Sequence, residues 1–265
     1  MVQTAGKIEV RMDYKISVYI PGKAASVAGE ILRDNVSELD LGVPYAEMMR
    51  YRIDGKASGE CNDVYYVCIN ENELVSRLWM GWGKHKNAVG NWGNFFTSPE
   101  YRGQGVGRKM LEFWQNDLKT RLDLPLALFC TAGDEWLAKL YAPYGFRPAI
   151  RNTACGPLYC PLKDSPETFS EFCEEYYKPA NSLVFKPATL EWRHEMDCLF
   201  KFAMLDLELP YLPEGMVSLE TSLLEEGGEG VEIIFTETNI PVGLAHTRPD
   251  GKRDLCLYPT YLHLI

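Results

Sequence analysis

A glycine-rich segment near the middle of the chain has the residue types of an anion-binding loop. It reads Tyr-Arg-Gly-Gln-Gly-Val-Gly-Arg-Lys over residues 101–109. A strand is expected before it, at 93–97, and an amphipathic helix after it. Glycines let the backbone turn and expose its N–H groups, and the first turn of a helix has unpaired donors at the positive end of its dipole. Such a junction binds phosphate groups, and Arg102 and Arg108 add positive charge.

Two common phosphate-loop patterns do not fit these letters. A Walker loop requires Lys followed by Ser or Thr after its last glycine, and Gly107 is followed by Arg108 and Lys109. A dinucleotide-binding fingerprint requires a third glycine at position 108, which is arginine. A nucleotide-dependent enzyme is therefore disfavoured.

The elements that must position the loop follow from the hydrophobic pattern. The helix after the loop is predicted from apolar residues at helical spacing, namely Val106, Met110, Leu111, Trp114, Leu118 and Leu122. Other expected elements are a strand at 8–20, a helix at 24–39, a hairpin of apolar runs at 64–69 and 74–82, a buried strand at 124–130 and a helix at 134–146.

The pattern Arg-x-x-Gly-x-Gly from Arg102 resembles the pyrophosphate loop of the GNAT superfamily of N-acetyltransferases. The preceding Pro-Glu-Tyr-Arg is similar to the family's approach to this loop. Residues 134–146 are similar to its second signature, a helix carrying Leu-Tyr and then Gly-Phe, and Tyr141 lies four residues before Gly145. The resemblance covers about residues 8–150 and has its motifs within 60–150.

The resemblance implies an α/β fold whose mixed, mostly antiparallel sheet is flanked by helices. The sheet is expected to splay between the strands at 91–97 and 124–130. Acetyl-CoA is the implied co-substrate, with its pantetheine arm beside the first of these strands and its diphosphate at the loop. The implied cofactor-binding residues are Phe95, Phe96, Thr97, Arg102, Gly103, Gln104, Gly105, Val106, Gly107, Arg108 and Asp134, where the family often has asparagine at the last position.

The implied reaction is direct transfer of an acetyl group to the primary amine of a small molecule or peptide. Tyr141 is the expected general acid, which protonates the departing thiolate. A backbone N–H near Phe96 or Thr97 is expected to polarise the thioester carbonyl. Glu100 is the candidate general base, with His85 as a second possibility. The alternative function is a non-enzymatic sensor or scaffold that binds acyl-CoA.

Composition limits the choice of partners. Acidic residues outnumber basic ones, 37 to 27, and the net charge is −10. This argues against general nucleic-acid binding, which needs a basic surface, and suits an amine substrate, although acidity also serves solubility. No stretch resembles a membrane helix or a signal peptide, so a cytoplasmic protein is expected. The eight cysteines include no Cys-x-x-Cys pair, and no metal is expected.

The chain is long enough for two domains. We expect a catalytic domain at 1–150, a linker and helix at 151–180, and a smaller α+β domain at 181–265. A second hairpin, at 231–239 and 240–246, precedes a strand at 255–258 and repeats the pattern of 64–82. The last domain is therefore expected to be a degenerate GNAT-like half without a phosphate loop. It would form an internal pseudo-dimer with the first, with a homodimer as the alternative.

Overall fold

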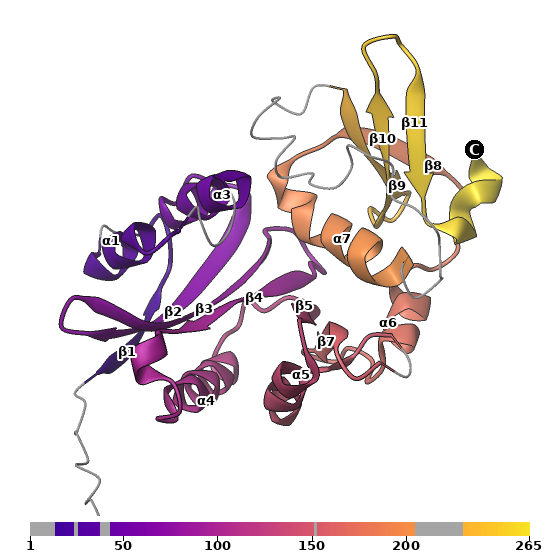
Figure 1. Cartoon of the computed structure of the whole chain (residues 1–265). Coiled ribbons are helices and arrows are strands. Elements are labelled where there is room, and N and C mark those ends of the chain that lie inside the picture. Colours follow the sequence, from indigo (N-terminus) through magenta and orange to yellow (C-terminus); the bar gives the residue numbers. More distant parts are fainter. Residues whose placement is uncertain (1–13, 24–25, 38–42, 151–152, 205–229) are drawn as a thin grey trace, which may run out of the picture.

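The computed structural model describes residues 14–23, 26–37, 43–150, 153–204 and 230–265. These residues form two sheets, one of seven strands and one of four (Figure 1). The larger sheet has the order β1-β2-β3-β4-β5-β7-β6. Its strands are β1 (Lys15–Tyr19), β2 (Cys61–Asn70), β3 (Glu73–Gly83), β4 (Gly90–Thr97), β5 (Ala127–Ala132), β6 (Arg147–Pro148) and β7 (Gly156–Pro161). Only β4 and β5 pair in parallel, which confirms the mixed, mostly antiparallel sheet.

Helices cover both faces of the larger sheet. On one face lie α1 (Val27–Asp34) and α3 (Val43–Ile53), and on the other lie α4 (Val106–Leu118) and α5 (Glu135–Tyr141) (Figure 1). Strand residues alternate between the faces. Tyr65 of β2 therefore packs in the core under α1 and α3, whereas its neighbour Tyr66 packs in the core under α4 and α5.

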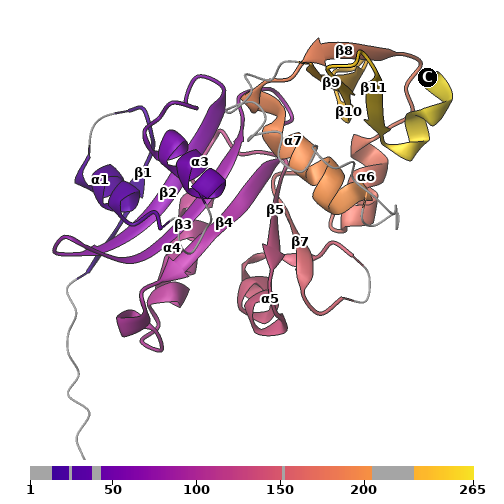
Figure 2. The same ribbon diagram turned by 45° about the horizontal axis from the view of Figure 1, so that its top comes forward.

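The larger sheet splays where β4 meets β5. These strands pair only at Gly90 with Leu128 and at Asn91 with Phe129, and beyond this place they diverge (Figure 2). We call the pair of Asn91 and Phe129 the splay point. The predicted splay is therefore confirmed.

Three expectations in the first half need adjustment. The strand predicted at 8–20 contains β1, and its residues 8–13 lie outside the described part; α1 lies within the helix predicted at 24–39. The helix after the loop begins at Val106 as predicted but ends at Leu118. Leu122 is not on its apolar face, since the residue is 97% exposed. The reason is that Thr120 donates its N–H and its hydroxyl to the carbonyl of Asp117, which closes the chain into a turn.

The expected linker after residue 150 contains a strand of the larger sheet. β7 pairs with β5 along its whole length, from Ala127 opposite Pro161 to Ala132 opposite Gly156. The helix expected within 151–180 is α6 (Phe169–Tyr176). Thr168 and Glu171 form a reciprocal capping box there, which satisfies two backbone donors and fixes the start.

The smaller sheet has the order β11-β10-β9-β8. Its strands are β8 (Leu183–Pro187), β9 (Val231–Thr236), β10 (Pro241–Thr247) and β11 (Arg253–Leu257), and α7 (Arg193–Cys198) follows β8. The predicted hairpin and following strand are present, whereas β8 and α7 were not foreseen. The first elements of the larger sheet follow the same order: one strand, then helices, then three antiparallel strands. This shared order supports the expectation that the second unit is a GNAT-like half, which stays a prediction.

The two sheets share one apolar core. Phe129 of β5 lies 5.1 Å from Phe202, which follows α7, and Tyr159 of β7 lies 5.5 Å from Phe172 of α6, measured between ring centres. The backbones also touch, because a Cβ atom at Gly83 would collide with the carbonyl oxygen of Glu191. The second unit thus packs on the face of β5 and β7 that α4 and α5 leave uncovered.

Candidate active site

The loop between β4 and α4 exposes a row of backbone donors. Among the described residues, none of the N–H groups from Gly103 to Arg108 donates a well-formed hydrogen bond. Gly103 and Gly105 have φ values of 72° and 79°, in the left-handed region that favours glycine. Gly105 is also the N-cap of α4, so the row continues into the positive end of the helix dipole.

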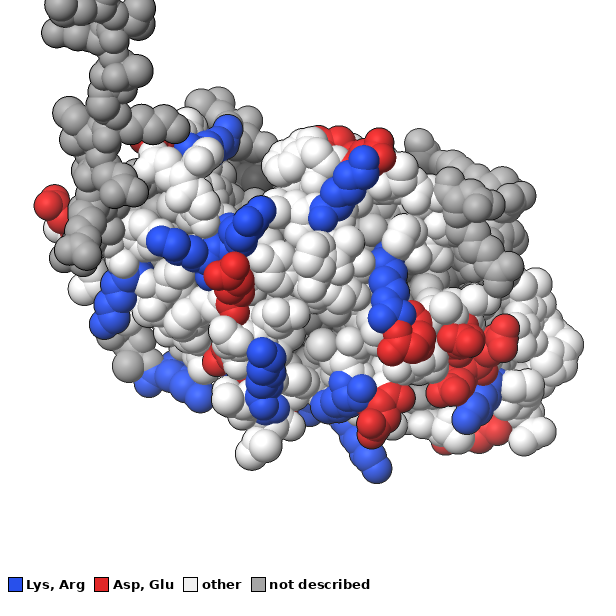
Figure 3. Space-filling model, turned by 90° about the horizontal axis from the view of Figure 1, so that it is seen from below, with Lys and Arg blue, Asp and Glu red and all other residues white. Residues whose placement is uncertain are grey.

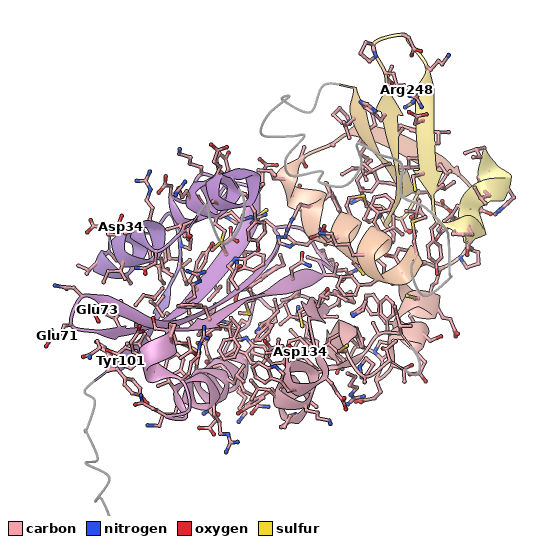
Figure 4. The ribbon with its side chains drawn as sticks, in the orientation of Figure 1. Asp34, Glu71, Glu73, Tyr101, Asp134 and Arg248 are labelled. Carbon is pink, nitrogen blue, oxygen red and sulfur yellow. The ribbon has the colours of Figure 1, made fainter. Side chains whose placement is uncertain are left out.

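Side chains hold the loop in this shape. Arg102 donates from Nε to the carbonyl of Thr97 at 2.9 Å, and Gln104 donates from Nε2 to the carbonyl of Glu100 at 2.7 Å. Tyr101 receives a hydrogen bond from Asn70 at 3.1 Å, which ties the loop to the tip of the β2–β3 hairpin (Figure 4). Because these bonds use no backbone N–H of the row, the donors remain available to an anion.

Basic side chains surround the loop. Arg102 and Arg108 flank the glycines, and Lys109 of α4 lies over the ring of Tyr14 at 5.2 Å. Figure 3 looks onto the side of the molecule that carries α4 and α5, and Lys and Arg side chains stand out on the half occupied by α4. The loop is therefore locally positive in a chain of net charge −10.

β4 has an irregular middle next to the splay. Its register with β3 shifts between Gly93 and Phe96, and Asn94 has a φ of 51°. Such a bulge bends the strand and twists it more strongly. The Oδ1 atom of Asn94 accepts a hydrogen bond of 3.0 Å from the hydroxyl of Tyr45 in α3. Beyond Asn91, the edge of β4 that faces β5 has no strand partner among the described residues.

The predicted strand residues of the site lie along this open edge. Phe95 faces α4, where a Cβ at Gly107 would be 3.1 Å from its ring. Phe96 points to the other face, and its ring lies 5.1 Å from the guanidinium of Arg77. The hydroxyl of Thr97 lies 3.1 Å from that of Ser76. The loop, Phe95 and Thr97 therefore meet on one side of the splay.

Tyr141 lies on the same side of the sheet as the loop. Its ring meets Trp92 of β4 edge-on at 4.9 Å and lies 6.0 Å from Phe95. The residue is 6% exposed, and its hydroxyl makes no hydrogen bond to the described residues. Burial, and then the nearby Cys130 and Asp134, raise the pKa of Tyr141 above its ordinary value of 10.0. The phenol therefore stays neutral, and its O–H can donate a hydrogen bond to a ligand.

Two further predicted residues, Asp134 and Glu100, lie at the start of α5 and in the turn after β4. Asp134 is the N-cap of α5, and its carboxylate accepts the N–H of Leu137 at 3.3 Å (Figure 4). The side chain of Asp134, predicted to contact the cofactor, thus caps α5. Glu100 lies in a 3-10 turn, Pro99–Tyr101, beyond the end of β4, and its side chain is exposed. The turn is at the loop end of β4, away from the splay point.

A polar cluster at the splay point was not foreseen from the sequence. Oδ1 of Asn91 accepts a hydrogen bond of 3.1 Å from Arg193 and lies 2.7 Å from Nδ1 of His194. Nδ1 also lies 3.3 Å from Nη1 of Arg193, and Nε2 is buried without a hydrogen-bond partner among the described residues. Burial, followed by the charges of Arg193 and Arg52, lowers the pKa of His194 well below 6.5. α7 thus brings a neutral imidazole to the splay point.

A second buried group supports this cluster from α3. Arg52 donates to both oxygens of Asp63, at 2.9 and 3.1 Å, and the indole of Trp79 donates to the same carboxylate at 2.8 Å. The sequence contains no local motif for the Asn91–His194 cluster or for the Arg52–Asp63 pair, because their residues come from α3, three strands and α7.

The described residues offer no other obvious chemistry. They contain no group of three or more His, Cys, Asp or Glu side chains placed to hold a metal ion. They also contain no disulfide, and seven of the eight cysteines are buried. No helix among them is long and apolar enough to cross a bilayer.

Comparison with known proteins identifies the part of the chain that carries this site. Residues 61–148 match the family model described as an acetyltransferase (GNAT) domain. This segment, about a third of the chain, contains β2 to α5 with the loop and Tyr141, and it is a GNAT acetyltransferase domain. None of the curated proteins matches the chain significantly.

Several solved structures are similar in fold to a little more than half of this chain. An acetyltransferase of the GNAT family from Staphylococcus aureus Mu50 is 14% identical, with 56% of this chain and 100% of that chain covered and a TM-score of 0.39. An acyl-CoA N-acyltransferase from Pseudomonas aeruginosa is 18% identical, with 56% and 99% covered and a TM-score of 0.39. A GNAT family acetyltransferase from Brucella melitensis, in complex with acetyl-CoA, is 11% identical, with 57% and 90% covered and a TM-score of 0.38. Likeness at this level carries no argument about the reaction.

Proposed function

We propose that this protein is an acetyl-CoA-dependent N-acetyltransferase. The observation that carries the proposal is the row of unpartnered N–H groups from Gly103 to Arg108 at the start of α4. A diphosphate has several anionic oxygens and fits such a row. The open edge of β4 adjoins the row, and its backbone groups suit the amides of a pantetheine arm. The match of residues 61–148 to the acetyltransferase (GNAT) family model supports the same cofactor.

Tyr141 is the proposed proton donor of the reaction. When acetyl-CoA is bound it supplies an activated thioester, and its thiolate must leave as the amine attacks. The hydroxyl of Tyr141 has no partner among the described residues and lies beside β4. A nearby O–H stabilises a departing thiolate. A backbone N–H of β4 near Phe96 or Thr97 remains the proposed donor to the thioester carbonyl.

The acceptor is proposed to be a primary amine of a small molecule or peptide. The net charge of −10 favours the approach of a cationic amine. Glu100 remains the candidate base, although its place beyond β4 would require it to act through water. The exposed carboxylate has room for such a water chain.

Two measurements test this function. Calorimetric titration of the full chain with acetyl-CoA is expected to show binding, and the absence of binding at high micromolar cofactor would remove the proposal. Turnover of an amine panel is then compared for wild type, Tyr141→Phe and Tyr144→Phe. Tyr141→Phe is expected to lower kcat on the order of a hundredfold because it removes the donor. Tyr144→Phe, three residues away, is the matched control and is expected to retain kcat.

A non-enzymatic acyl-CoA sensor is the second candidate. The observation in its favour is that α7 covers the splay point, where His194 is fully buried. Acetyl-CoA binding without turnover of any amine would support this candidate over the enzyme.

The second unit is proposed to act as an internal pseudo-dimer partner. It covers the apolar face of β5 and β7 through Phe129 and Tyr159, a face that a homodimer would otherwise need to cover. We expect a monomer by light scattering. A stable homodimer, or scattering from two independently tumbling lobes, would contradict this arrangement.

A further inference from the structure

A cavity of about 490 Å³ lies where the two units meet. It opens beside Asn87, just before β4, whereas the glycine loop follows β4, so the cavity is at the other end of this strand. Its walls are the turn after β7, the end of α6 and the β9–β10 turn. The proposed acetyl-transfer site uses none of the residues that line it.

Part of the cavity lining is a group of apolar and aromatic residues. Leu126, Phe172, Tyr176 and Ile240 form it, and the rings of Phe172 and Tyr176 stack at 5.1 Å. Tyr176 is 8% exposed, and its hydroxyl makes no hydrogen bond to the described residues. A nearly buried O–H without a partner is costly unless water or a ligand satisfies it.

The rim carries two charges of each sign. Lys163 and Asp164 stand on the wall after β7, and Glu175 and Lys178 stand on the wall formed by α6. Within the described part of the chain, none of these four side chains forms an ion pair. Opposite charges therefore face one space without neutralising each other.

Both walls are held in place by buried or strained groups. Ser165 donates its hydroxyl to the carbonyl of Leu126 at 2.8 Å, and Tyr261 donates to the carbonyl of Lys178 at 2.7 Å. Lys163 and Asn87 have φ values of 51° and 62°, which side chains other than glycine rarely adopt. Such strain gathers at sites that hold ligands.

We propose that this cavity binds a small zwitterion with a flat apolar body, of the class of aromatic α-amino acids. The ring would lie on Phe172 and Tyr176, the carboxylate would meet a lysine of the rim, and the ammonium would meet an acid. The hydroxyl of Tyr176 would hydrogen-bond to the ligand. The volume falls within the range of about 300–1,000 Å³ usual for small-molecule pockets. A ligand with one charge would match only half of the rim.

Probe compounds test the charge requirement on the full chain. L-phenylalanine is titrated calorimetrically beside 3-phenylpropanoate, which lacks the ammonium group, and phenethylamine, which lacks the carboxylate. The amino acid is expected to bind at least about tenfold more tightly than either, because each missing charge removes a charge-assisted hydrogen bond. Equal binding of a single-charge probe, or no binding of phenylalanine at millimolar concentration, would overturn the proposal.

Variants test the place of binding. Lys178→Met, Glu175→Gln and Tyr176→Phe are each expected to weaken phenylalanine binding by about threefold to tenfold. Lys15→Met, on the remote strand β1, is the matched control, and circular dichroism confirms folding of each variant. Unchanged affinity in all three variants would overturn the site.

The acetyl-CoA site is tested separately in the same variants. All of them are expected to bind acetyl-CoA like wild type, whether or not the protein proves to be an acetyltransferase. If phenylalanine is instead acetylated and its binding is lost in Tyr141→Phe, the ligand belongs to the transfer site and the second site is disproved.

Discussion

Gly105 must satisfy two conditions at once. Its φ of 79° is unfavourable for any residue with a Cβ, and its N–H belongs to the row that faces the proposed diphosphate. A Cβ there would meet no protein atom within 4 Å, so the space next to Gly105 is open to a ligand. Conformation and cofactor binding are thus both sensitive to this one residue.

Gly105→Val is expected to weaken acetyl-CoA binding by at least about tenfold, since a β-branched residue disfavours the left-handed region and fills the cradle. Calorimetry measures the effect. Gly59→Val is the matched control, because Gly59 also has open space around it but has no positive φ. A similar loss of affinity in both variants would show that the loop conformation is not the cause.

At the residue scale, local patterns predicted part of the site. The glycines of the loop and Tyr141 were found because each belongs to a short motif. The contact between Asn91 and His194 was not found, since 103 residues separate its partners and neither belongs to a motif. The apolar spacing continues to Leu122, so the pattern predicted a helix up to that residue. The spacing does not reveal the turn at Thr120 that follows the end of α4.

At the scale of elements, one ion pair joins the β3–β4 turn to α7. Nε2 of His85 lies 3.1 Å from Oε1 of Glu195, which also accepts the N–H of Val89 at 2.9 Å. Nδ1 of His85 lies 3.2 Å from the carbonyl of Lys86, so both ring nitrogens face acceptors. Burial lowers the pKa of His85, but the nearby carboxylate of Glu195 outweighs this effect and raises the pKa above 6.5.

This raised pKa gives the fold a pH dependence. Stability from the pair is fully present below pH about 6.5, the unfolded value, and is lost as the pH rises through the higher folded value. His85→Gln is expected to lower the free energy of unfolding by about 1–3 kcal/mol at pH 6 and by less at pH 8.5. Urea unfolding at both values measures it.

His263→Gln is the control for this experiment, since His263 is exposed and its Nδ1 lies 3.0 Å from the nearby carbonyl of Thr260. A loss that is equal at pH 6 and pH 8.5 would mean that packing against Trp192, 3.8 Å away, and not charge, stabilises the contact.

Elements with a clear periodic pattern were predicted better than those without one. β2, β3 and α4 have long apolar faces, and the sequence located all three. β7 was assigned to a linker because residues 147–165 carry several prolines, including Pro157 and Pro161 within the strand, and show no clear period. Its strand conformation depends on pairing with β5, which is a tertiary effect.

At the scale of the whole molecule, the shared core predicts cooperative unfolding. Phe129 of the larger sheet contacts rings from α6 and from the segment after α7. Phe129→Ala is expected to cost about 3–5 kcal/mol through the cavity it leaves. The loss should reach both sheets, because the residue is buried between them.

Hydrogen exchange followed by mass spectrometry can resolve this effect by segment. Faster exchange is expected in β5 and also in β9 and β10 of the variant. Leu74→Ala is a comparison in the core under α1 and α3, away from the second unit. If Phe129→Ala loosens only the larger sheet, the two units are independent domains.

The position of β7 has a practical consequence. In the strand order, β6 reaches the rest of the larger sheet only through β7, which lies between it and β5. The family match ends at residue 148, before β7 begins. The matched segment therefore ends before the larger sheet is complete. A fragment cut at residue 148 would keep β6 but lose β7, the strand with which β6 pairs. The aromatic face of β5 would then be exposed to water.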